Sequence, residues 1–295
     1  MQSLTATVRF SVWAASPPET QRLDEGALLI AEIGHPNLDH RRAIRQLDAL
    51  AAEVWASLGP STRLLRSHQV ARRTSALRVL EAINEILIAR HGFHGSNDDY
   101  YHPRNSFLNE VLERREGLPI TLSVIYLEVA RRLGAPLEGV GLPAHFMARW
   151  PLPDDAGGSI YVDAFQRGEL LDELAMRQRI LRLIGAPARA TFDPAWSRAL
   201  DAREILTRML RNLKQVYLMR GETADALETA DRLTALRPDL PEELRDRGLL
   251  RLAMGESLLA AADITAYLEH TPDAPEGGRL LRRIQSIREV HAKLN

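Results

Sequence analysis

Two side chains suited to acid–base chemistry, His145 and Asp163, lie on segments that the sequence predicts as neighbouring strands. Val140–Trp150 and Ile160–Phe165 are short and are flanked by Pro and Gly. If they form a hairpin, period-two geometry places His145 opposite residue 163 or 164, with both side chains on one sheet face. An imidazole beside a carboxylate can act as a general base, because the carboxylate fixes its tautomer. The alternatives are a structural pair that satisfies two buried polar groups, or a site that binds a ligand without catalysis.

A hydroxyl that such a base could activate occurs in the segment before these strands. Residues 117–136 predict a helix that starts at Pro119 and ends in a turn, and Ser123 shares a helix face with Pro119. A hydrolase or acyl-transfer enzyme would use Ser123 as nucleophile with His145 and Asp163. The other interpretation of Ser123 is a buried hydroxyl bonded to a backbone carbonyl one turn back. The chain has no Cys, which excludes a Cys nucleophile, disulfides and thiolate metal sites.

Other residues that could bind a metal or a cofactor lack the required spacing. None of the histidines and aspartates of the N-terminal part forms an HExxH motif or a comparable helical pair: His35, His40, His91, His94, Asp98, Asp99 and His102. The phosphate-binding loop, the dinucleotide-binding glycine motif and the G-x-S-x-G elbow are also absent from the sequence. We therefore expect no metal and no cofactor, and solvated loop side chains at these positions.

The composition argues against several classes of partner. The 295 residues carry 38 Lys and Arg against 39 Asp and Glu, so charge gives no reason to expect nucleic acid or an anionic membrane. No apolar run approaches the ~20 residues that span a bilayer. The N-terminus lacks the charged and then apolar layout of a signal peptide. The sequence therefore predicts a cytoplasmic protein that binds neither nucleic acid nor membrane.

The elements that must position the candidate residues fall into a helical segment and a segment with strands. Over residues 1–110, apolar side chains recur at helical spacing, and Asp39 is suited to cap one of the helices. Residues 111–200 hold the helix that starts at Pro119 and the two predicted strands. Aromatic residues make up only 5% of a chain rich in Ala, Leu and Arg. This composition favours helices, so we predict a mostly helical α+β fold with a small antiparallel sheet.

Residues 203–295 contain an internal repeat with a period of 34 residues. In the two copies, Leu213, Tyr217, Gly221, Ala226 and Pro238 align with Arg247, Arg251, Gly255, Ala260 and Pro272. This period, with glycines for a tight turn and alanines for close helix approach, is typical of tetratricopeptide repeats. We predict two tetratricopeptide-like hairpins, a capping helix over about residues 276–293, and a protein or peptide partner in their groove. Arg211, Lys214 and Arg245 are the predicted contacts for that partner.

Three motifs of the central segment resemble a known family. Asn105–Ser123, Pro143–Met147 and Tyr161–Phe165 resemble the bacterial SirB-type proteins, in which a transglutaminase-like domain precedes tetratricopeptide repeats. The resemblance implies a transglutaminase-like core of the papain-like superfamily. We predict that this core, with a helical N-terminal region, occupies residues 1–200 and that the repeats occupy residues 201–295. Related domains accompany F-box proteins in eukaryotes, which favours a role in scaffolding or recognition.

The same resemblance implies roles for the candidate site residues. His145 matches the catalytic His of active members, and Asp163 matches the acid that orients it. The nucleophilic Cys starts the helix, and counting back about fifteen residues from Gly134 reaches Pro119. Pro119 removes both the nucleophile and an N–H that could donate to an oxyanion. We therefore predict a non-catalytic pseudo-enzyme, an interaction or regulatory module. The alternative is the hydrolase or acyl-transfer enzyme that uses Ser123.

Overall fold

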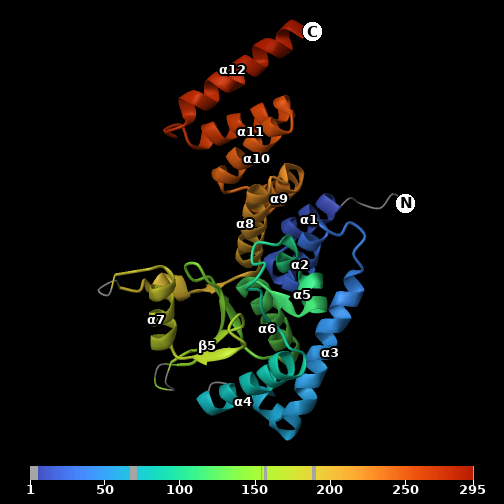
Figure 1. Ribbon diagram of the computed structural model, residues 1–295, viewed down its shortest axis with the longest axis vertical. Coiled ribbons are helices and arrows are strands. Elements are labelled where there is room, and N and C mark those ends of the chain that lie inside the picture. The colour runs from blue at the N-terminus through green and yellow to red at the C-terminus, as the bar shows by residue number, and fades with distance from the viewer. Residues whose placement is uncertain (1–5, 67–71, 154, 156–157, 188–190, 295) are drawn as a thin grey trace. The chain divides into compact units, whose positions relative to one another are not determined.

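The computed structural model describes residues 6–66, 72–153, 155, 158–187 and 191–294. The chain divides into two compact units (Figure 1). The core unit is Arg22–Met209, and the repeat unit combines Met1–Gln21 with Leu210–Asn295. Helices form most of both units, and the described strands belong to the core unit. The predicted mostly helical α+β fold with a small antiparallel sheet is therefore confirmed.

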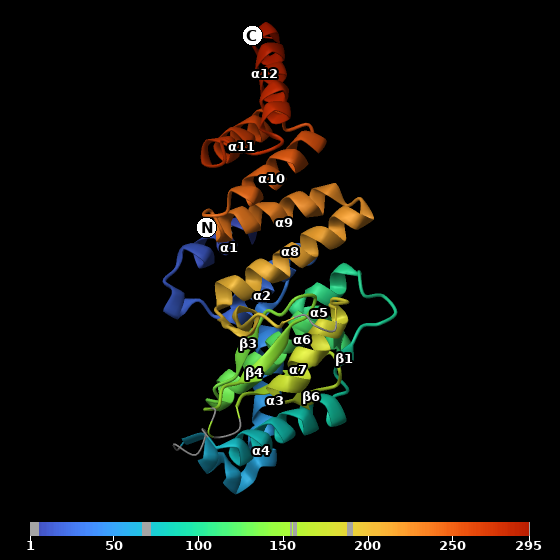
Figure 2. The same cartoon turned by 90° about the vertical axis from the view of Figure 1, so that its left-hand side faces the viewer.

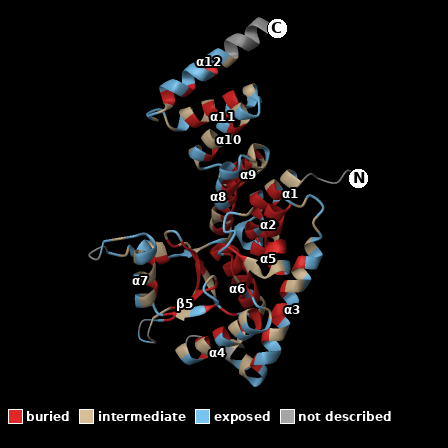
Figure 3. Ribbon diagram, in the orientation of Figure 1, coloured by how far each residue is buried: buried red, intermediate tan, exposed pale blue. Residues whose placement is uncertain are grey.

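One helix of the core unit, α6 (Pro119–Leu133), is buried along nearly its whole length (Figure 3). It contacts the sheet and four helices: α2 (Leu23–Ala31), α3 (His40–Leu58), α4 (Arg73–Asn84) and α5 (Leu108–Arg114). As predicted, α6 starts at Pro119 and is ended by Gly134, whose φ of 72° is left-handed. Asp39 caps α3 as predicted, since its carboxylate accepts a hydrogen bond from the Arg42 N–H at 3.3 Å.

Shorter elements connect these helices. Helix α4 continues into the π-helical segment η4 (Glu85–Arg90). The 3₁₀ segments of the core unit are η2 (Gly59–Arg66), η5 (Pro103–Ser106) and η7 (Pro194–Ser197). Two very short strands, β1 (His94–Gly95) and β2 (Glu116–Gly117), pair in parallel. This pair brings the loop before α5 next to the start of α6.

Five short strands form an antiparallel sheet in the order β6-β5-β4-β3-β7. They are β3 (Glu138–Val140), β4 (Met147–Trp150), β5 (Ile160–Asp163), β6 (Glu169–Leu171) and β7 (Ala199–Leu200). The predicted hairpin is present as β4 and β5, in which Ala148 lies opposite Val162. Helix α7 (Glu173–Leu183) packs on the sheet through Met176 and Ile180, which contact Met147 and other buried strand residues (Figure 1). The sheet thus lies between α6 and α7.

The predicted strand Val140–Trp150 is interrupted, and this corrects the position of His145. Residues 141–146 turn the chain from β3 to β4, so His145 lies in the turn and not on a strand. Pro143 cannot donate to a strand ladder, and Ala144 has a left-handed φ of 56°. The prediction that His145 lies on a strand opposite residue 163 or 164 was therefore wrong.

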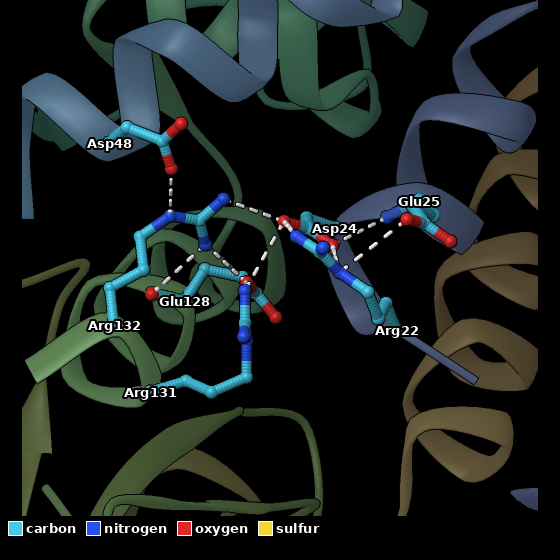
Figure 4. A network of polar contacts seen from close by, with 7 residues as sticks. All are labelled: Arg22, Asp24, Glu25, Asp48, Glu128, Arg131 and Arg132. Atoms are coloured by element: carbon cyan, nitrogen blue, oxygen red, sulfur yellow. Dashed lines mark hydrogen bonds and ion pairs between the residues drawn. The ribbon is translucent and has the colours of Figure 1, made fainter. Parts of the chain in front are cut away.

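A cluster of charged side chains, here called the Asp24–Arg132 network, ties α2, α3 and α6 together (Figure 4). The Arg132 guanidinium donates to Asp24 of α2 at 2.7 Å and to Asp48 of α3 at 2.7 Å. It also donates to Glu128, one turn before it on α6. Asp24 and Glu128 are fully buried. Because the network joins three helices around buried charge, it fixes how α6 sits among its neighbours.

The repeat unit is a series of helices joined by tight turns (Figure 2). Its elements are α1 (Ala6–Ala15), η1 (Pro18–Thr20), α9 (Thr223–Leu236), α10 (Pro241–Ala253), α11 (Ser257–His270) and α12 (Gly277–Leu294). The division between the units falls within α8 (Ala202–Arg220). Gly221 and Gly255, at equivalent repeat positions, have φ of 72° and 80°, which favours glycine over other residues. The predicted turns between paired helices are present at both glycines, and α12 takes the place of the predicted capping helix.

The position of α1 differs from the predicted domain division. Residues 1–21 were predicted to belong with residues 22–200, but α1 contacts α9 of the repeat unit. Phe10 and Trp13 provide the buried face of α1. The Gln21 side-chain amide donates to the carbonyls of Ala14 and Ser16 and so satisfies the end of the helix. Hydrophobic burial decides this pairing, and no local sequence signal reveals which distant helix supplies the partner surface.

Candidate functional site

A pocket of about 500 Å³ opens in the core unit beside His145 and Asp163. It joins the start of α6, the turn before β4, the end of β5 and helix α7. Its walls are formed by Tyr100, Pro119, Ala144, His145, Asp163, Phe165, Gln166, Arg179, Arg182 and Leu183. Pro119, the position that the resemblance assigns to the nucleophile, therefore faces the same space as the two acid–base candidates.

Asp163 is the fully buried anion of the pocket. Its Oδ2 accepts a hydrogen bond from Arg179 Nη1 at 2.9 Å, and its Oδ1 accepts one from the Gln166 backbone N–H at 3.2 Å. Burial opposes ionisation of this carboxyl, but the contacts with His145 and Arg179 outweigh it and lower the pKa of Asp163 below its ordinary value. Asp163 is therefore negatively charged at neutral pH.

His145 is nine-tenths buried and lies against Asp163. Its Nε2 is 2.9 Å from Asp163 Oδ2, and this contact lowers the pKa of Asp163. Arg208 supports the turn from behind, because its Nη2 donates to the backbone carbonyls of Leu142 and His145. The backbone of His145 is thus fixed, and its ring lies in the pocket wall with the buried Nε2 against Asp163.

Aromatic side chains form the apolar wall next to His145. The Phe165 ring meets the His145 ring edge to face at 6.4 Å, and Tyr100 meets Phe165 in the same way at 6.0 Å. Phe165 lies so close to Gly95 that a Cβ at residue 95 would be 2.5 Å from its ring. Because residue 95 is glycine, the Phe165 ring can pack directly against the backbone of β1. This packing fixes the position of the ring in the pocket wall.

Pro119 leaves the start of α6 without reactive groups. It has no hydroxyl, thiol or N–H. The neighbouring Leu118 N–H donates to Thr121 Oγ1 at 3.0 Å, and the Thr121 hydroxyl donates to the Asn105 carbonyl at 2.7 Å. The first turn of α6 is therefore closed by contacts within the protein.

Comparison with known proteins decides the family. Residues 41–211, more than half of the chain, match the transglutaminase-like superfamily. The chain belongs to the transglutaminase-like superfamily. Residues 213–285 match the tetratricopeptide repeat, which confirms the repeats predicted from the 34-residue period. Within the described residues, the structure contains no helix long and apolar enough to cross a membrane.

Several relatives of this transglutaminase-like protein share most of its length. A UPF0162 protein of Xylella fastidiosa (strain 9a5c) is 40% identical over 86% of this chain and 85% of the relative. A UPF0162 protein of Vibrio cholerae is 28% identical over 91% and 93% of the two chains. F-box only protein 21 of Mus musculus is 38% identical over 46% of this chain and 21% of its own length. No solved structure matches. The narrower SirB-type assignment stays a prediction, because these relatives bear other names.

Ser123, the candidate nucleophile, has a different environment from the other two candidates of this transglutaminase-like core. It is fully buried and is not among the residues that line the pocket. Its hydroxyl has no hydrogen-bond partner among the described residues, so the predicted bond to a backbone carbonyl one turn back is not formed. The structure thus brings His145 and Asp163 together at the pocket, while Ser123 lies one turn deeper in α6. The catalytic roles of all three stay predictions.

Sequence reasoning missed the two arginines that α7 contributes. Arg179 donates to Asp163 through one arm and to Glu169 of β6 through the other, at 2.9 and 2.7 Å. Arg182, one turn later, also lines the pocket. Apolar periodicity in this helix predicts which face meets the sheet, and Met176 and Ile180 occupy that face. It does not reveal that the adjoining face borders a buried carboxylate.

The histidines considered for metal binding mostly form pairs with single glutamates. His40 lies 2.8 Å from Glu32 and His91 lies 2.9 Å from Glu53. His35 similarly lies 3.1 Å from Glu110. Within the described residues, His, Asp and Glu side chains form no group of three that could hold a metal ion. These pairs join neighbouring elements, so the interpretation as purely solvated loop side chains was incomplete.

Proposed function

We propose that this transglutaminase-like protein is non-catalytic and acts as an interaction or regulatory module. The observation that carries the proposal is the make-up of the pocket, whose lining contains no Ser, Thr or Cys among the described residues. Pro119 occupies the position that the resemblance assigns to the nucleophile. An imidazole and a carboxylate without a nucleophile can bind and orient a ligand, but they lack the group that would form a covalent intermediate.

The remaining polar groups of the pocket are poor substitutes for a nucleophile. Asp163 is fully buried and engaged by Arg179, so its oxygens are already committed. Burial raises the pKa of the Tyr100 hydroxyl above its ordinary value, which keeps it protonated at neutral pH. Neither group therefore offers an anion ready to attack a substrate.

A serine-directed fluorophosphonate probe tests this proposal on the full chain. We expect no label after prolonged incubation, as measured by intact-protein mass spectrometry beside an active serine hydrolase. Ser123→Ala is the informative variant, and Ser57→Ala, at an exposed serine of α3, is its matched control. Labelling of Ser123 that disappears in His145→Ala would establish the alternative, a hydrolase or acyl-transfer enzyme.

The interaction role rests on the repeat unit, and the residues predicted to contact a partner turn out to be engaged there. Lys214 Nζ lies 2.8 Å from Glu243 and 2.7 Å from Asp246. Arg211 donates to Glu243 at 2.7 Å, and Arg245 donates to Asp246 at 2.9 Å. The pairs of Arg211 and Lys214 join α8 to α10, while Arg245 pairs with its neighbour on α10. That these three residues contact a partner stays a prediction.

Helix α12 offers a surface that differs from the rest of the repeat unit. Arg279, Arg282 and Arg283 are exposed, and none forms an ion pair with a described residue. A groove of about 420 Å³ between α11 and α12 has Leu268 and Leu281 in its wall, and the three arginines lie on α12 outside its lining. A peptide with acidic residues around an apolar side chain would match this surface in charge and in hydrophobicity. An acidic, apolar peptide segment is therefore the partner that we propose.

Selection from a phage-displayed random peptide library tests this partner class. Full-length protein should enrich peptides in which Asp and Glu flank a large apolar residue. The triple variant with Gln at 279, 282 and 283 should lose this enrichment, because the unpaired positive charge is gone. Arg41, Arg42 and Arg45 on α3 provide a matched triple Gln control that should retain it. An enrichment that is neutral or basic, or unchanged in the α12 variant, would contradict the proposal.

A further inference from the structure

The charges of the pocket do not balance, and this imbalance points to a ligand. One carboxylate, Asp163, faces two guanidinium groups and one imidazole across the lining. Arg179 divides its two arms between Asp163 and Glu169, so its charge is matched. Arg182 has no acidic partner among the described residues, and its Nε donates only to the Gln178 carbonyl at 3.3 Å. Arg182, which is exposed to solvent, is therefore the cation of the lining that a bound anion could reach.

His145 adds an imidazole to the same lining. Its side chain is only 7% exposed, and its buried Nε2 lies 2.9 Å from Asp163 Oδ2. Asp163 therefore holds this nitrogen, which leaves Arg182 as the cation that a ligand anion in the pocket would meet.

The remaining lining is apolar and shaped for more than a bare ion. Phe165 and Tyr100 present aromatic surface, and Leu183 is half exposed at the pocket although it is a large aliphatic side chain. An exposed leucine beside aromatic rings gains free energy when a ligand covers it. A volume of about 500 Å³ suits an organic molecule and exceeds what an inorganic anion would fill.

We infer that the pocket binds a small organic anion in which an aromatic or branched aliphatic body carries one carboxylate. The carboxylate lies at Arg182, because the planar guanidinium fork matches its two oxygens. The apolar body contacts Phe165, Tyr100 and Leu183. This inference rests on the proposed function in one respect, namely that the pocket binds its ligand without transforming it.

Binding of two matched probes to the full chain tests the inference. N-acetyl-L-phenylalanine carries the carboxylate, and N-acetyl-L-phenylalaninamide has the same body without the charge. By titration calorimetry or ligand-observed NMR, we expect the acid to bind at least about tenfold more tightly than the amide. Equal binding of the two probes, or binding of neither up to millimolar concentration, would overturn the inference.

The variant Arg182→Gln locates the anion site within the molecule. It should reduce the preference for the acid to less than about threefold while leaving binding of the amide unchanged, because only the carboxylate contact is lost. Arg41→Gln removes an exposed positive charge from α3 of the same unit and should leave the preference intact. If the preference for the acid is unchanged in Arg182→Gln, the anion binds elsewhere and the assignment of the carboxylate to Arg182 is wrong.

A third probe separates the two anions that could use an arginine. Phenyl phosphate should bind more weakly than the carboxylate probe, and a tighter, Arg182-dependent affinity for it would overturn the carboxylate assignment. Failure here is distinct from failure of the proposed function. Fluorophosphonate labelling or turnover would disprove a non-catalytic role without affecting these affinities, whereas weak binding of all three probes would leave that role untouched.

Discussion

The core unit holds two clusters of buried charge, the Asp24–Arg132 network and the pocket cluster of Asp163, His145 and Arg179. In the first, Asp24 and Glu128 are fully buried and accept hydrogen bonds from arginines on α6 (Figure 4). In the second, Asp163 is equally buried but lines a pocket of about 500 Å³. Burial and pairing are common to both clusters, and the second one also lines a pocket.

The comparison shows which features of a buried charge point to function. Burial opposes ionisation of Asp24, but hydrogen bonds from Arg22 and Arg132 outweigh it and hold its pKa at about 2. The pKa of Asp163 is also lowered, so a lowered pKa does not distinguish a structural cluster from a binding site. The pocket cluster differs because it lines a pocket and adjoins Arg182, which has no acidic partner among the described residues. A cation without a partner beside an opening is therefore the better sign of a ligand site.

The largest effect is expected from breaking the Asp24–Arg132 network. Arg132→Met removes a cation that binds both buried carboxylates, while Arg22 and Arg131 remain beside them. Removal of one partner from a buried ion pair costs about 3–5 kcal/mol, which is the upper limit here. We expect the free energy of unfolding to fall by up to that amount, as measured by urea denaturation monitored by circular dichroism.

The matched control for Arg132→Met lies at the edge of the same network. Asp48 also binds Arg132, but its side chain is 58% exposed. Asp48→Asn should cost less than about 1 kcal/mol, because solvent screens an exposed pair. Similar losses for the two variants would show that the buried carboxylates are not what makes Arg132 important.

A smaller effect, with a pH dependence, is expected from Asp163→Asn in the pocket. Because the folded-state pKa of Asp163 is lowered, its charge stabilises the fold above its ordinary value of 3.8, and this contribution is lost as the pH falls through the folded-state pKa. The variant should lose about 1.5–3 kcal/mol at pH 7, as expected for hydrogen bonds to a charged group. The deficit should shrink as the pH falls below 3.8 in urea denaturation series at several pH values.

Glu128→Gln in the other cluster should show the opposite pH dependence. Burial and the nearby charge of Asp24 raise the pKa of Glu128, so its ionisation costs stability as the pH rises above its ordinary value of 4.5. The free energy of unfolding of the wild type should therefore exceed that of the Gln variant by more at low pH than at pH 7. Parallel pH profiles for Asp163→Asn and Glu128→Gln would contradict the opposite pKa shifts of the two carboxyls.

An effect of about one pKa unit is expected when a thiol is placed in the pocket. The chain has no Cys, so Pro119→Cys introduces a single reactive group. The start of α6 and the neighbouring His145 both favour the thiolate, which should lower the thiol pKa from its usual value of about 8.5 to below about 7.5. The pH dependence of the rate of alkylation by iodoacetamide, followed by mass spectrometry, measures this pKa.

Two further variants show whether the pocket causes that shift. Ala52→Cys places a thiol at an exposed position within α3 and should react with the pKa of an ordinary cysteine, about 8.5. Adding His145→Ala to Pro119→Cys should reverse part of the shift. A thiol at residue 119 that reacts like the one at residue 52 would show that the pocket has no remaining ability to activate a nucleophile.

Local patterns in the sequence predicted much of this fold because their causes are local. The helix from Pro119 to Gly134 follows from a proline start and a glycine stop, and the 34-residue period reveals the tandem helices. The position of His145 was missed because Ala144 adopts a left-handed conformation. This conformation is rare for residues other than glycine, so the sequence gives no sign of it. The contact of Arg179 with Asp163 joins two elements whose relative rotation depends on the packing of α7 on the sheet. Such contacts depend on tertiary structure and leave no trace in spacing alone.

The smallest effect is expected at Ser123, and a neighbour on the same helix sharpens it. Ser123 and Thr121 are both fully buried, but only the Thr121 hydroxyl is bonded, to the Leu118 N–H and the Asn105 carbonyl. Ser123→Ala removes an unsatisfied polar group, so it should change the free energy of unfolding by less than about 1 kcal/mol or increase it. Thr121→Ala leaves the Leu118 N–H and the Asn105 carbonyl without this hydrogen-bond partner. It should lower the free energy of unfolding by about 1–3 kcal/mol in the same urea denaturation assay. A loss at Ser123 as large as that at Thr121 would mean that its hydroxyl has a partner, and would reopen the case for Ser123 as a functional residue.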